Sequence, residues 1–331
     1  MKLSRLLALA AACVLAACSP AKKPVLDANG LTPIKFATDW HAQAEQGGFY
    51  EALATGEYKK RGLDVTIVQG GPAVNVPQLL ATGAIDMGMG SNSFIVMNLA
   101  NAHAPVRAVA AFMQKDPQVL LAHPDAGINS IADMKGHPIL LSDASKTAFW
   151  PWMKAKYGFA DAQVRSYTFD NAPFILDHHV VQEGYLTSEP YTIEKTGKFT
   201  PKVFLLADQG YPSYAAMVLA PDALISKNPA AVKAFVEASA VGWKNYLHGD
   251  PKPADDLILK DNPDMTEDVL AQARDKMRQY GLVDGGDATT LGIGAMTDAH
   301  WEAFFKIASP KGTQNARDAF SLQFLPNPPV K

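Results

Sequence analysis

Apolar and polar positions in residues 34–71 alternate in a way that predicts a strand, a polar loop, a helix and a second strand. Residues 34–37 form a short apolar run, and a helical pattern follows from Phe49 to Tyr58. The basic turn before Gly62, and that glycine itself, are typical of a helix end. Residues 63–67 then alternate apolar and polar side chains, as a half-buried strand does. Such a unit predicts parallel strands joined by a right-handed crossover.

The same pattern recurs in the middle of the chain. Residues 139–141 are apolar, residues 142–147 are polar, and a helical stretch with aromatic side chains follows at residues 148–157. A second α/β unit is therefore expected, and it should form a second domain. Loops at the carboxyl ends of such strands hold ligands in open α/β sheets, so residues 40–45 and 70–75 are predicted ligand loops. Amphipathic patterns farther along predict helices at residues 228–247, 254–259, 266–280 and 298–307.

The first 17 residues have the pattern of an export signal. Lys2 and Arg5 precede an apolar run that is too short to span a bilayer. The run ends in a small-residue cleavage site before Cys18, which is the pattern of a bacterial lipoprotein signal, and Cys18 would then carry the lipid. An ordinary signal peptide is the alternative. Residues 18–33 are small, polar and interrupted by prolines, which predicts a tether.

Charge and cysteine content exclude several classes of function. Removing Lys2 and Arg5 with the signal changes the formal charge from -3 to -5, so no basic field for nucleic acid remains. Cys13 leaves with the signal and Cys18 is the predicted lipid site. The mature chain therefore has no cysteine for a disulfide, a thiolate metal site or a nucleophile.

Catalytic and metal-binding motifs are scarce. The chain has no phosphate loop, no His-Glu-x-x-His zinc motif and no Gly-x-Ser-x-Gly elbow. His178 and His179 are adjacent and project in different directions, so we interpret them as surface residues. We expect no metal, no cofactor and no enzymatic activity.

Aromatic side chains near predicted loop–helix junctions are the main candidate ligand contacts. Flat ligands are held by ring faces together with a few directed polar groups. The selected aromatic residues are Trp40, Tyr50, Trp150, Tyr185 and Tyr214. His41, beside Trp40, is a further candidate, and a loop histidine that bonds its own backbone is the alternative.

Three polar residues complete the predicted site. Glu189 lies in an apolar, aromatic stretch, where a carboxylate is costly unless something pairs with it. A ligand with N–H donors would pair with Glu189, and a salt bridge or a helix cap is the alternative. Asn92 has the position of an N-cap and could also contact a ligand. Ser145 lies in the second polar loop and could supply a secondary polar contact.

Several stretches resemble the periplasmic solute-binding proteins of ABC importers, in the branch that binds nitrate, sulfonates, taurine and thiamine precursors and includes thiamine-pyrimidine synthase-like proteins. The likeness starts at Asp39-Trp40, includes residues 48–50 and 62–65, and covers nearly the whole mature chain. Residues 184–190 are most similar to the thiamine-precursor branch, whose matching glutamate, here Glu189, belongs to the pyrimidine site. The usual family opening, Asp-Trp-x-Pro-Asn-Thr-Asn-His, is here Asp-Trp-His-Ala-Gln-Ala-Glu-Gln. Riboflavin, sulfonate, taurine and nitrate therefore stay open as ligands.

The resemblance implies the type II periplasmic binding protein fold, an α/β architecture of two domains joined by a two-strand hinge. Domain 1 would comprise residues 34–120 and 216–331, and domain 2 would comprise residues 121–215. The chain would cross between them near residues 119–123 and 214–220.

The resemblance also implies a function. The ligand would be a small aromatic heterocycle, with a thiamine pyrimidine precursor favoured, and it would be passed to an ABC permease and its ATPase. The protein would be periplasmic and held to a bacterial membrane through the lipid on Cys18. A thiamine-pyrimidine synthase-like enzyme is the alternative of another class, but it depends on a cysteine-rich iron motif. A lipoprotein that presents its ligand to a membrane receptor is a third possibility.

Overall fold

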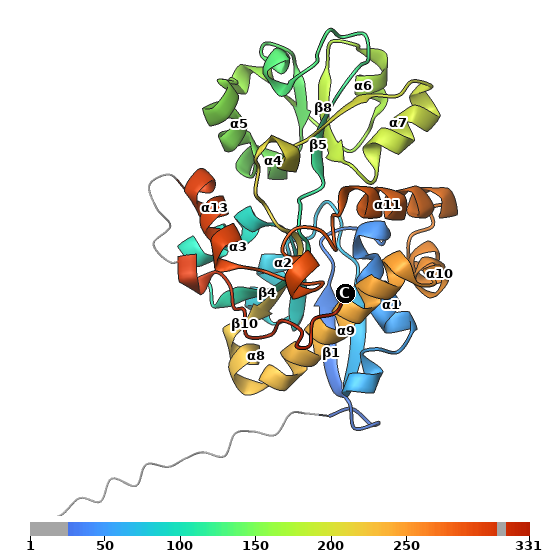
Figure 1. Cartoon of the computed structure of the whole chain (residues 1–331), viewed down its shortest axis with the longest axis vertical. Helices are drawn as coiled ribbons and strands as arrows, with labels where there is room; N and C mark the ends of the chain where they lie inside the picture. Colours follow the sequence, from blue (N-terminus) through green and yellow to red (C-terminus); the bar gives the residue numbers. More distant parts are fainter. Residues whose placement is uncertain (1–25, 310–315) are drawn as a thin grey trace, which may run out of the picture.

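The computed structural model describes residues 26–309 and 316–331, which form two lobes stacked along the long axis of the molecule (Figure 1). The first lobe is built on a five-stranded sheet of order β2-β1-β3-β10-β4. Its strands are β1 (Thr32–Ala37), β2 (Leu63–Val68), β3 (Met87–Asn92), β4 (Val106–Met113) and β10 (Ala215–Pro221). Strand β1 pairs in parallel with β2 and β3, as the alternating pattern predicted, and β10 lies antiparallel between β3 and β4.

The second lobe repeats this arrangement with a sheet of order β7-β6-β8-β5-β9. Its strands are β5 (Gln118–Ala122), β6 (Ile139–Leu141), β7 (Val164–Ser166), β8 (Val181–Tyr185) and β9 (Lys202–Leu205). Strand β6 is parallel to β7 and β8, whereas β5 is antiparallel to β8 and β9. The predicted second α/β unit is confirmed.

Helices complete both lobes. Those of the first lobe are α1 (Gly47–Ala54), α2 (Val76–Thr82), α3 (Ser93–Asn101), α8 (Asp222–Lys227), α9 (Pro229–His248), α10 (Lys252–Asp261), α11 (Glu267–Tyr280), α12 (Ala288–Leu291) and α13 (Asp298–Ala308), with short 3-10 turns at Ala44–Gln46, Lys59–Arg61 and Ala316–Asp318. Those of the second lobe are α4 (Asp143–Thr147), α5 (Trp150–Tyr157), α6 (Ala172–Leu176) and α7 (Glu189–Gly197), with 3-10 turns at Ile131–Met134, Asp161–Gln163 and Ala207–Gln209. The four helices predicted after residue 228 are all present.

The core of the first lobe depends on a close approach of α1 to α9. A Cβ atom on Gly242 would lie 2.1 Å from the carbonyl oxygen of Gly48, and a Cβ atom on Gly48 would lie 2.1 Å from the Trp243 ring. Glycine at both positions lets the two backbones touch. Trp243 and Phe49 then pack edge to face, with ring centroids 6.0 Å apart.

Helix α1 ends four residues earlier than predicted. Gly56 has a positive φ of 74°, and the amide of Glu57 donates to the carbonyl of Ala52. The amide of Gly56 donates to the carbonyl of Leu53, which completes a Schellman motif. The first glycine after the apolar pattern therefore stops the helix, and Gly62 ends only the following 3-10 turn.

The second predicted polar loop, residues 142–147, is also different, because most of it is helix α4. The Ser142 hydroxyl accepts a hydrogen bond from the amide of Ser145 and caps this helix. A capping serine before a short polar helix has the same composition as a loop, so the pattern of side chains did not distinguish them.

The chain passes between the lobes twice, in residues 114–117 and 206–214. The amide of Asp116 donates to the carbonyl of Ser213 at 3.0 Å, so the two connections run side by side. Each crossing lies just before the residues expected from the resemblance, because Val119 and Ala215 already pair within a sheet. The division into domains at residues 120 and 215 remains a prediction.

Candidate functional site

The facing sides of the two lobes are in direct contact. The Thr187 hydroxyl of the second lobe donates to Glu45 of the first, and Gln272 of α11 donates to the carbonyl of Thr187. The ring of Trp40, after β1, lies 4.7 Å from the ring of Phe169, after β7. These contacts close the lobes over the residues between them.

A second set of contacts joins α7 to α11 at the edge of this junction. The Tyr191 hydroxyl and the Lys195 ammonium both donate to the same carboxylate oxygen of Asp268, each at 2.6 Å. The bonds from Lys195 and Tyr191 hold the pKa of Asp268 below its usual range. The Lys195–Asp268 ion pair is exposed, so salt weakens it. We call these bonds of Tyr191 and Lys195 to Asp268 the α7–α11 latch.

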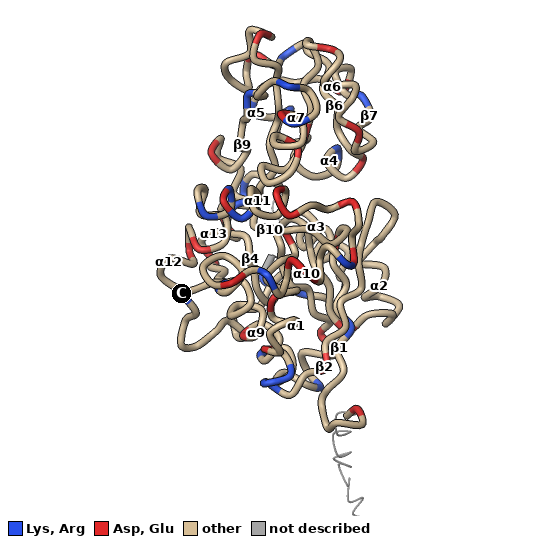
Figure 2. The backbone as a smooth tube through the Cα atoms, turned by 90° about the vertical axis from the view of Figure 1, so that its right-hand side faces the viewer, with Lys and Arg blue, Asp and Glu red and all other residues tan. Residues whose placement is uncertain are grey.

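Five carboxyl groups gather where the lobes meet, and acidic positions are visible at the waist of the molecule (Figure 2). Glu45, Asp116 and Glu183 are buried, whereas Asp39 and Glu189 are half-buried. The charge of Asp39 raises the pKa of Glu45, and the charges of Glu45 and Glu183 raise that of Glu189. Asp116 belongs to the same region, because its charge and those of Asp39 and Glu45 raise the pKa of the Tyr185 phenol. Burial is the largest cause of the raised pKa in all five. The pKa values of Asp116 and Glu189 both rise to about 7.

In the part of the chain that the structure describes, these carboxyl groups form no ion pairs, although the charge of Lys146 lowers the pKa of Glu183. Among the described residues, none of the five lies within ion-pair distance of a lysine, arginine or histidine. Glu183 accepts from the amide of Ser142 at 2.9 Å through Oε1, but its buried Oε2 has no hydrogen-bond partner. Gln46 donates to Asp39 at 3.1 Å, and its own buried Oε1 is also unpartnered. A ligand that brings N–H donors would satisfy these acceptors.

The sequence around Glu189 explains how its carboxylate reaches this group. Strand β8 ends at Tyr185, whose amide donates to Glu189 at 2.6 Å. A Cβ atom on Gly184 would lie 2.8 Å from Cβ of Glu189, so only glycine leaves room for the turn. Glu189 is the first residue of α7, where the free amides of a helix start favour a carboxylate, and Pro190 suits the same turn.

The structure brings several of the predicted residues to this junction. Glu189 and Tyr185 are bonded to each other, and the raised pKa of the Tyr185 phenol has burial as its main cause, followed by the charges of Asp116, Asp39 and Glu45. The amide of Ser145 donates to the Ser142 hydroxyl, and the Ser145 side chain lowers the pKa of Glu183. Trp40 packs against Phe169 of the other lobe.

Asn92 and His41 lie at the first-lobe side of the junction. The Asn92 carboxamide accepts from the amides of Phe94 and Ile95, so it caps α3 as the sequence allowed. The side chain of its neighbour Ser91 lowers the pKa of Asp39. His41 is exposed, and its ring lies 5.6 Å from that of Trp40.

Tyr50, Trp150 and Tyr214 are not brought to this group. All three are buried in the hydrophobic clusters, and the polar group of each ring donates a hydrogen bond to a carboxylate. The partners are Asp261 for Tyr50 at 3.0 Å, Asp161 for Trp150 at 2.8 Å and Asp287 for Tyr214 at 2.6 Å. A buried tyrosine or tryptophan whose polar group has a hydrogen-bond partner has the same sequence pattern as a ring that binds a ligand.

Sequence reasoning missed Asp39, Glu45, Asp116, Glu183 and Phe169 as members of the junction. Asp39 and Glu45 had a detectable signal, because they lie in the polar loop after the first strand. Glu183 lies inside strand β8 and Asp116 inside a crossing, so only the fold brings each of them to the lobe junction. Phe169 has a positive φ of 64° and is partly exposed, which the sequence does not indicate.

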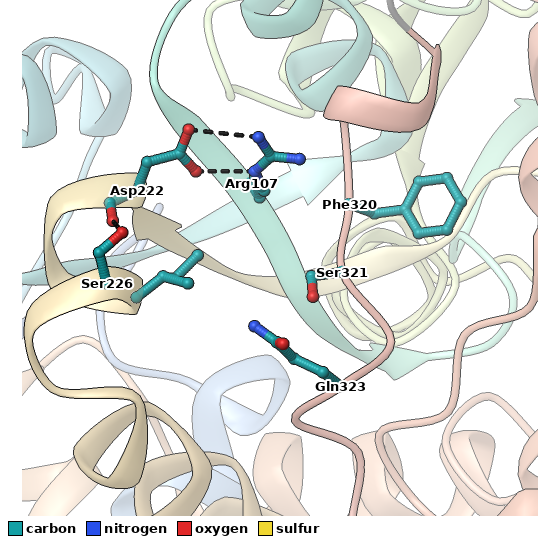
Figure 3. Close-up of a pocket in the computed structure, with 7 residues that line it drawn as sticks. Arg107, Asp222, Ser226, Phe320, Ser321 and Gln323 are labelled. Atoms are coloured by element: carbon teal, nitrogen blue, oxygen red, sulfur yellow. Dashed lines mark hydrogen bonds and ion pairs between the residues drawn. The ribbon is translucent and has the colours of Figure 1, made fainter.

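A surface cavity of about 310 Å³ lies elsewhere, in the first lobe (Figure 3). Arg107 and Asp222 line it and form a two-bond ion pair of 2.7 and 3.3 Å. The amide of Ser321 donates to the carbonyl of Ala108, so the C-terminal segment forms another wall. This ion pair and backbone bond tie α8 and the C-terminal segment to β4, and the cavity is separate from the lobe junction.

Within residues 26–309 and 316–331, no helix is long and apolar enough to cross a bilayer. Cys18, the predicted lipid site, lies outside the described residues, as do the predicted signal and residues 18–25 of the tether.

Comparison with known proteins gives consistent results. Residues 43–254 match the family model described as NMT1/THI5 like. The riboflavin-binding protein RibY of Chloroflexus aurantiacus is 25% identical over 94% of this chain and 91% of its own, and the formylaminopyrimidine-binding protein of Halalkalibacterium halodurans is 23% identical over 90% and 84%. The periplasmic aliphatic sulphonate binding protein SsuA of Escherichia coli has a TM-score of 0.68 at 14% identity, covering 87% of this chain and 92% of its own. The predicted two-lobed periplasmic binding protein fold is confirmed, and the chain belongs to the NMT1/THI5-like family of solute-binding proteins.

Proposed function

We propose that this protein is a lipid-anchored, periplasmic solute-binding protein that carries a small aromatic heterocycle with N–H donors to an ABC permease and its ATPase. The observation that carries the proposal is the group of five carboxyls at the lobe junction, which keeps an unpartnered buried acceptor on Glu183. A thiamine pyrimidine precursor is the favoured ligand. Riboflavin is the second candidate, because a relative that matches over most of its length is a riboflavin-binding protein.

The chemistry of recognition follows from the two kinds of group at the junction. Glu189 and Glu183 accept hydrogen bonds from amino groups or ring N–H groups, and a carboxylate acceptor makes a stronger bond than a neutral one. The rings of Trp40 and Phe169 supply apolar faces for a flat ligand. Since the pKa of Glu189 is about 7, it can also share a proton with a weakly basic ring nitrogen.

Anionic ligands fit this junction poorly. A sulfonate or nitrate would be placed next to Glu45 and Glu189, whose pKa values neighbouring carboxylates already raise. It would find no arginine or lysine paired to the group among the described residues. This argues against the sulfonate, taurine and nitrate alternatives.

Ligand release requires the lobes to part. The paired crossings at residues 114–117 and 206–214 would act as the hinge, and the contacts of Thr187 and Asp268 would form only when the lobes close. Binding then favours the closed state, because ligand contacts from both lobes exist together only there.

The test is calorimetry of the unlipidated mature chain with an aminopyrimidine, riboflavin, taurine and nitrate. We expect saturable 1:1 binding of the aminopyrimidine or of riboflavin and negligible heat from the two anions. Native mass spectrometry of the purified protein would identify a ligand that it already carries. Tight taurine or nitrate binding without binding of either heterocycle would overturn the proposal.

A further inference from the structure

A cluster of possible metal ligands lies in the second lobe, away from the lobe junction. His123, Asp125 and His178 each offer one ligand atom, and these atoms all lie within 4.8 Å of one another. His123 follows β5, and His178 precedes β8, which pairs antiparallel with β5. Their proximity is a product of the sheet register, since 55 positions of sequence separate the two histidines.

The site is distinct from the proposed ligand site. Strand β5 pairs Gln118 with Tyr185, which lies at the lobe junction, and Leu121 with Gln182 farther into the second lobe. His123 lies five residues beyond Gln118. At about 3.3 Å per residue this places it roughly 16 Å from Gln118.

His123 is held in one orientation. It is buried, and its ring stacks on that of Phe199 with centroids 4.2 Å apart. Its Nε2 lies 2.6 Å from the carbonyl oxygen of Phe174. A carbonyl only accepts, so Nε2 carries the proton and the lone pair is on Nδ1. A ring nitrogen that donates to a backbone carbonyl while the other nitrogen stays free is the usual arrangement of a metal-binding histidine.

The other two groups are free to adjust. His178 Nδ1 lies 2.9 Å from a carboxylate oxygen of Asp125, and both side chains are more than half exposed. The rings of His178 and His123 lie parallel, with centroids 4.1 Å apart. One fixed and two movable ligands can therefore converge on an ion by rotation of exposed side chains alone.

We propose that His123, Asp125 and His178 form a site for a divalent transition-metal ion such as Zn²⁺, with water in the remaining positions. Two imidazoles and one carboxylate suit Zn²⁺, Ni²⁺ or Cu²⁺, whereas Ca²⁺ and Mg²⁺ prefer oxygen ligands alone. Adjacent His178 and His179 could not make such a site by themselves. The partner of His178 is His123, which the sequence does not indicate.

The experiment is a Zn²⁺ titration of tag-free mature protein against a chromophoric chelator. The ligand variants are His178→Ala and Asp125→Asn, and the matched control is His179→Ala, because His179 is also exposed and adjacent in the chain but outside the cluster. Glu189→Gln controls for Zn²⁺ held by the carboxyl groups of the lobe junction. Melting temperatures of the metal-free variants establish that each one is folded.

We expect one Zn²⁺ per chain, with affinity reduced about tenfold or more in both ligand variants and unchanged in both controls. Cobalt(II) should give a visible spectrum that is lost in His178→Ala alone of the two histidine variants. Zinc binding that survives His178→Ala and Asp125→Asn, or that falls equally in His179→Ala, would overturn the site. Neither result depends on which organic ligand the junction binds.

Discussion

Glu189→Gln tests ligand recognition and the cost of a buried charge at one position. Glutamine keeps the shape of the side chain, and its carbonyl can still accept from the amide of Tyr185. The change removes the negative charge and replaces one acceptor with a donor. A hydrogen bond to a charged group contributes about 1.5–3 kcal/mol. Affinity for a ligand with N–H donors should therefore fall by about tenfold to a hundredfold.

The same substitution should raise the free energy of unfolding of the ligand-free protein while it lowers ligand affinity. Burial, with the charges of Glu45 and Glu183, raises the pKa of Glu189 from 4.5 to about 7. Between these values the folded state keeps a proton that the unfolded state has released, so wild-type stability falls as pH rises and the loss is complete above about pH 7. Glutamine does not titrate. The ligand-free variant should therefore gain about 2–3 kcal/mol over wild type between pH 5 and pH 8.

The assays are calorimetry with an aminopyrimidine at pH 7 and urea unfolding of the ligand-free proteins at pH 5 and pH 8. Glu194→Gln is the matched control, because Glu194 is on the same helix and exposed. It should change neither affinity nor the pH dependence. If Glu189→Gln binds as tightly as wild type, or if its stability difference is the same at both pH values, Glu189 is not a desolvated acceptor in the ligand site.

Further outcomes follow from the contacts between the lobes, from the core and from the predicted anchor. Trp40→Ala should weaken heterocycle binding by about tenfold, because the ring face opposite Phe169 is lost, and calorimetry with unchanged affinity would exclude stacking there. Asp268→Asn should enlarge the radius of gyration of the ligand-free protein in X-ray scattering, since the α7–α11 latch is broken, and an identical profile would show that the latch does not hold the lobes. Gly242→Ala should destabilise the first lobe by about 3 kcal/mol or more in urea unfolding, because its methyl group meets backbone, and a near-neutral effect would contradict the α1–α9 packing. Cys18→Ala should abolish lipid processing and membrane attachment, and correctly processed variant in the membrane fraction would refute the lipoprotein signal.

Local pattern alone was enough to predict the repeated α/β units and the helices after residue 228. Alternation of side chains and apolar spacing depend only on neighbours within a few residues, so they can be read directly from the sequence. The turn from Gly184 to Glu189 is also local, but the steric requirement for glycine that positions the Glu189 carboxylate became visible only in the structure. The end of α1 was predicted at the wrong one of two nearby glycines, because both Gly56 and Gly62 have the positive φ that can end a helix.

Membership of the lobe junction, the candidate ligand site, was decided by tertiary structure. Tyr50 and Tyr214 have the composition and position expected of ligand contacts, but the folded chain buries them against Asp261 and Asp287. Conversely, Glu183 is unremarkable inside a strand and joins Glu189 at the lobe junction only because β8 leads directly to α7. Burial and the proximity of charges arise from contacts between residues far apart in the chain, and local periodicity carries no information about those contacts.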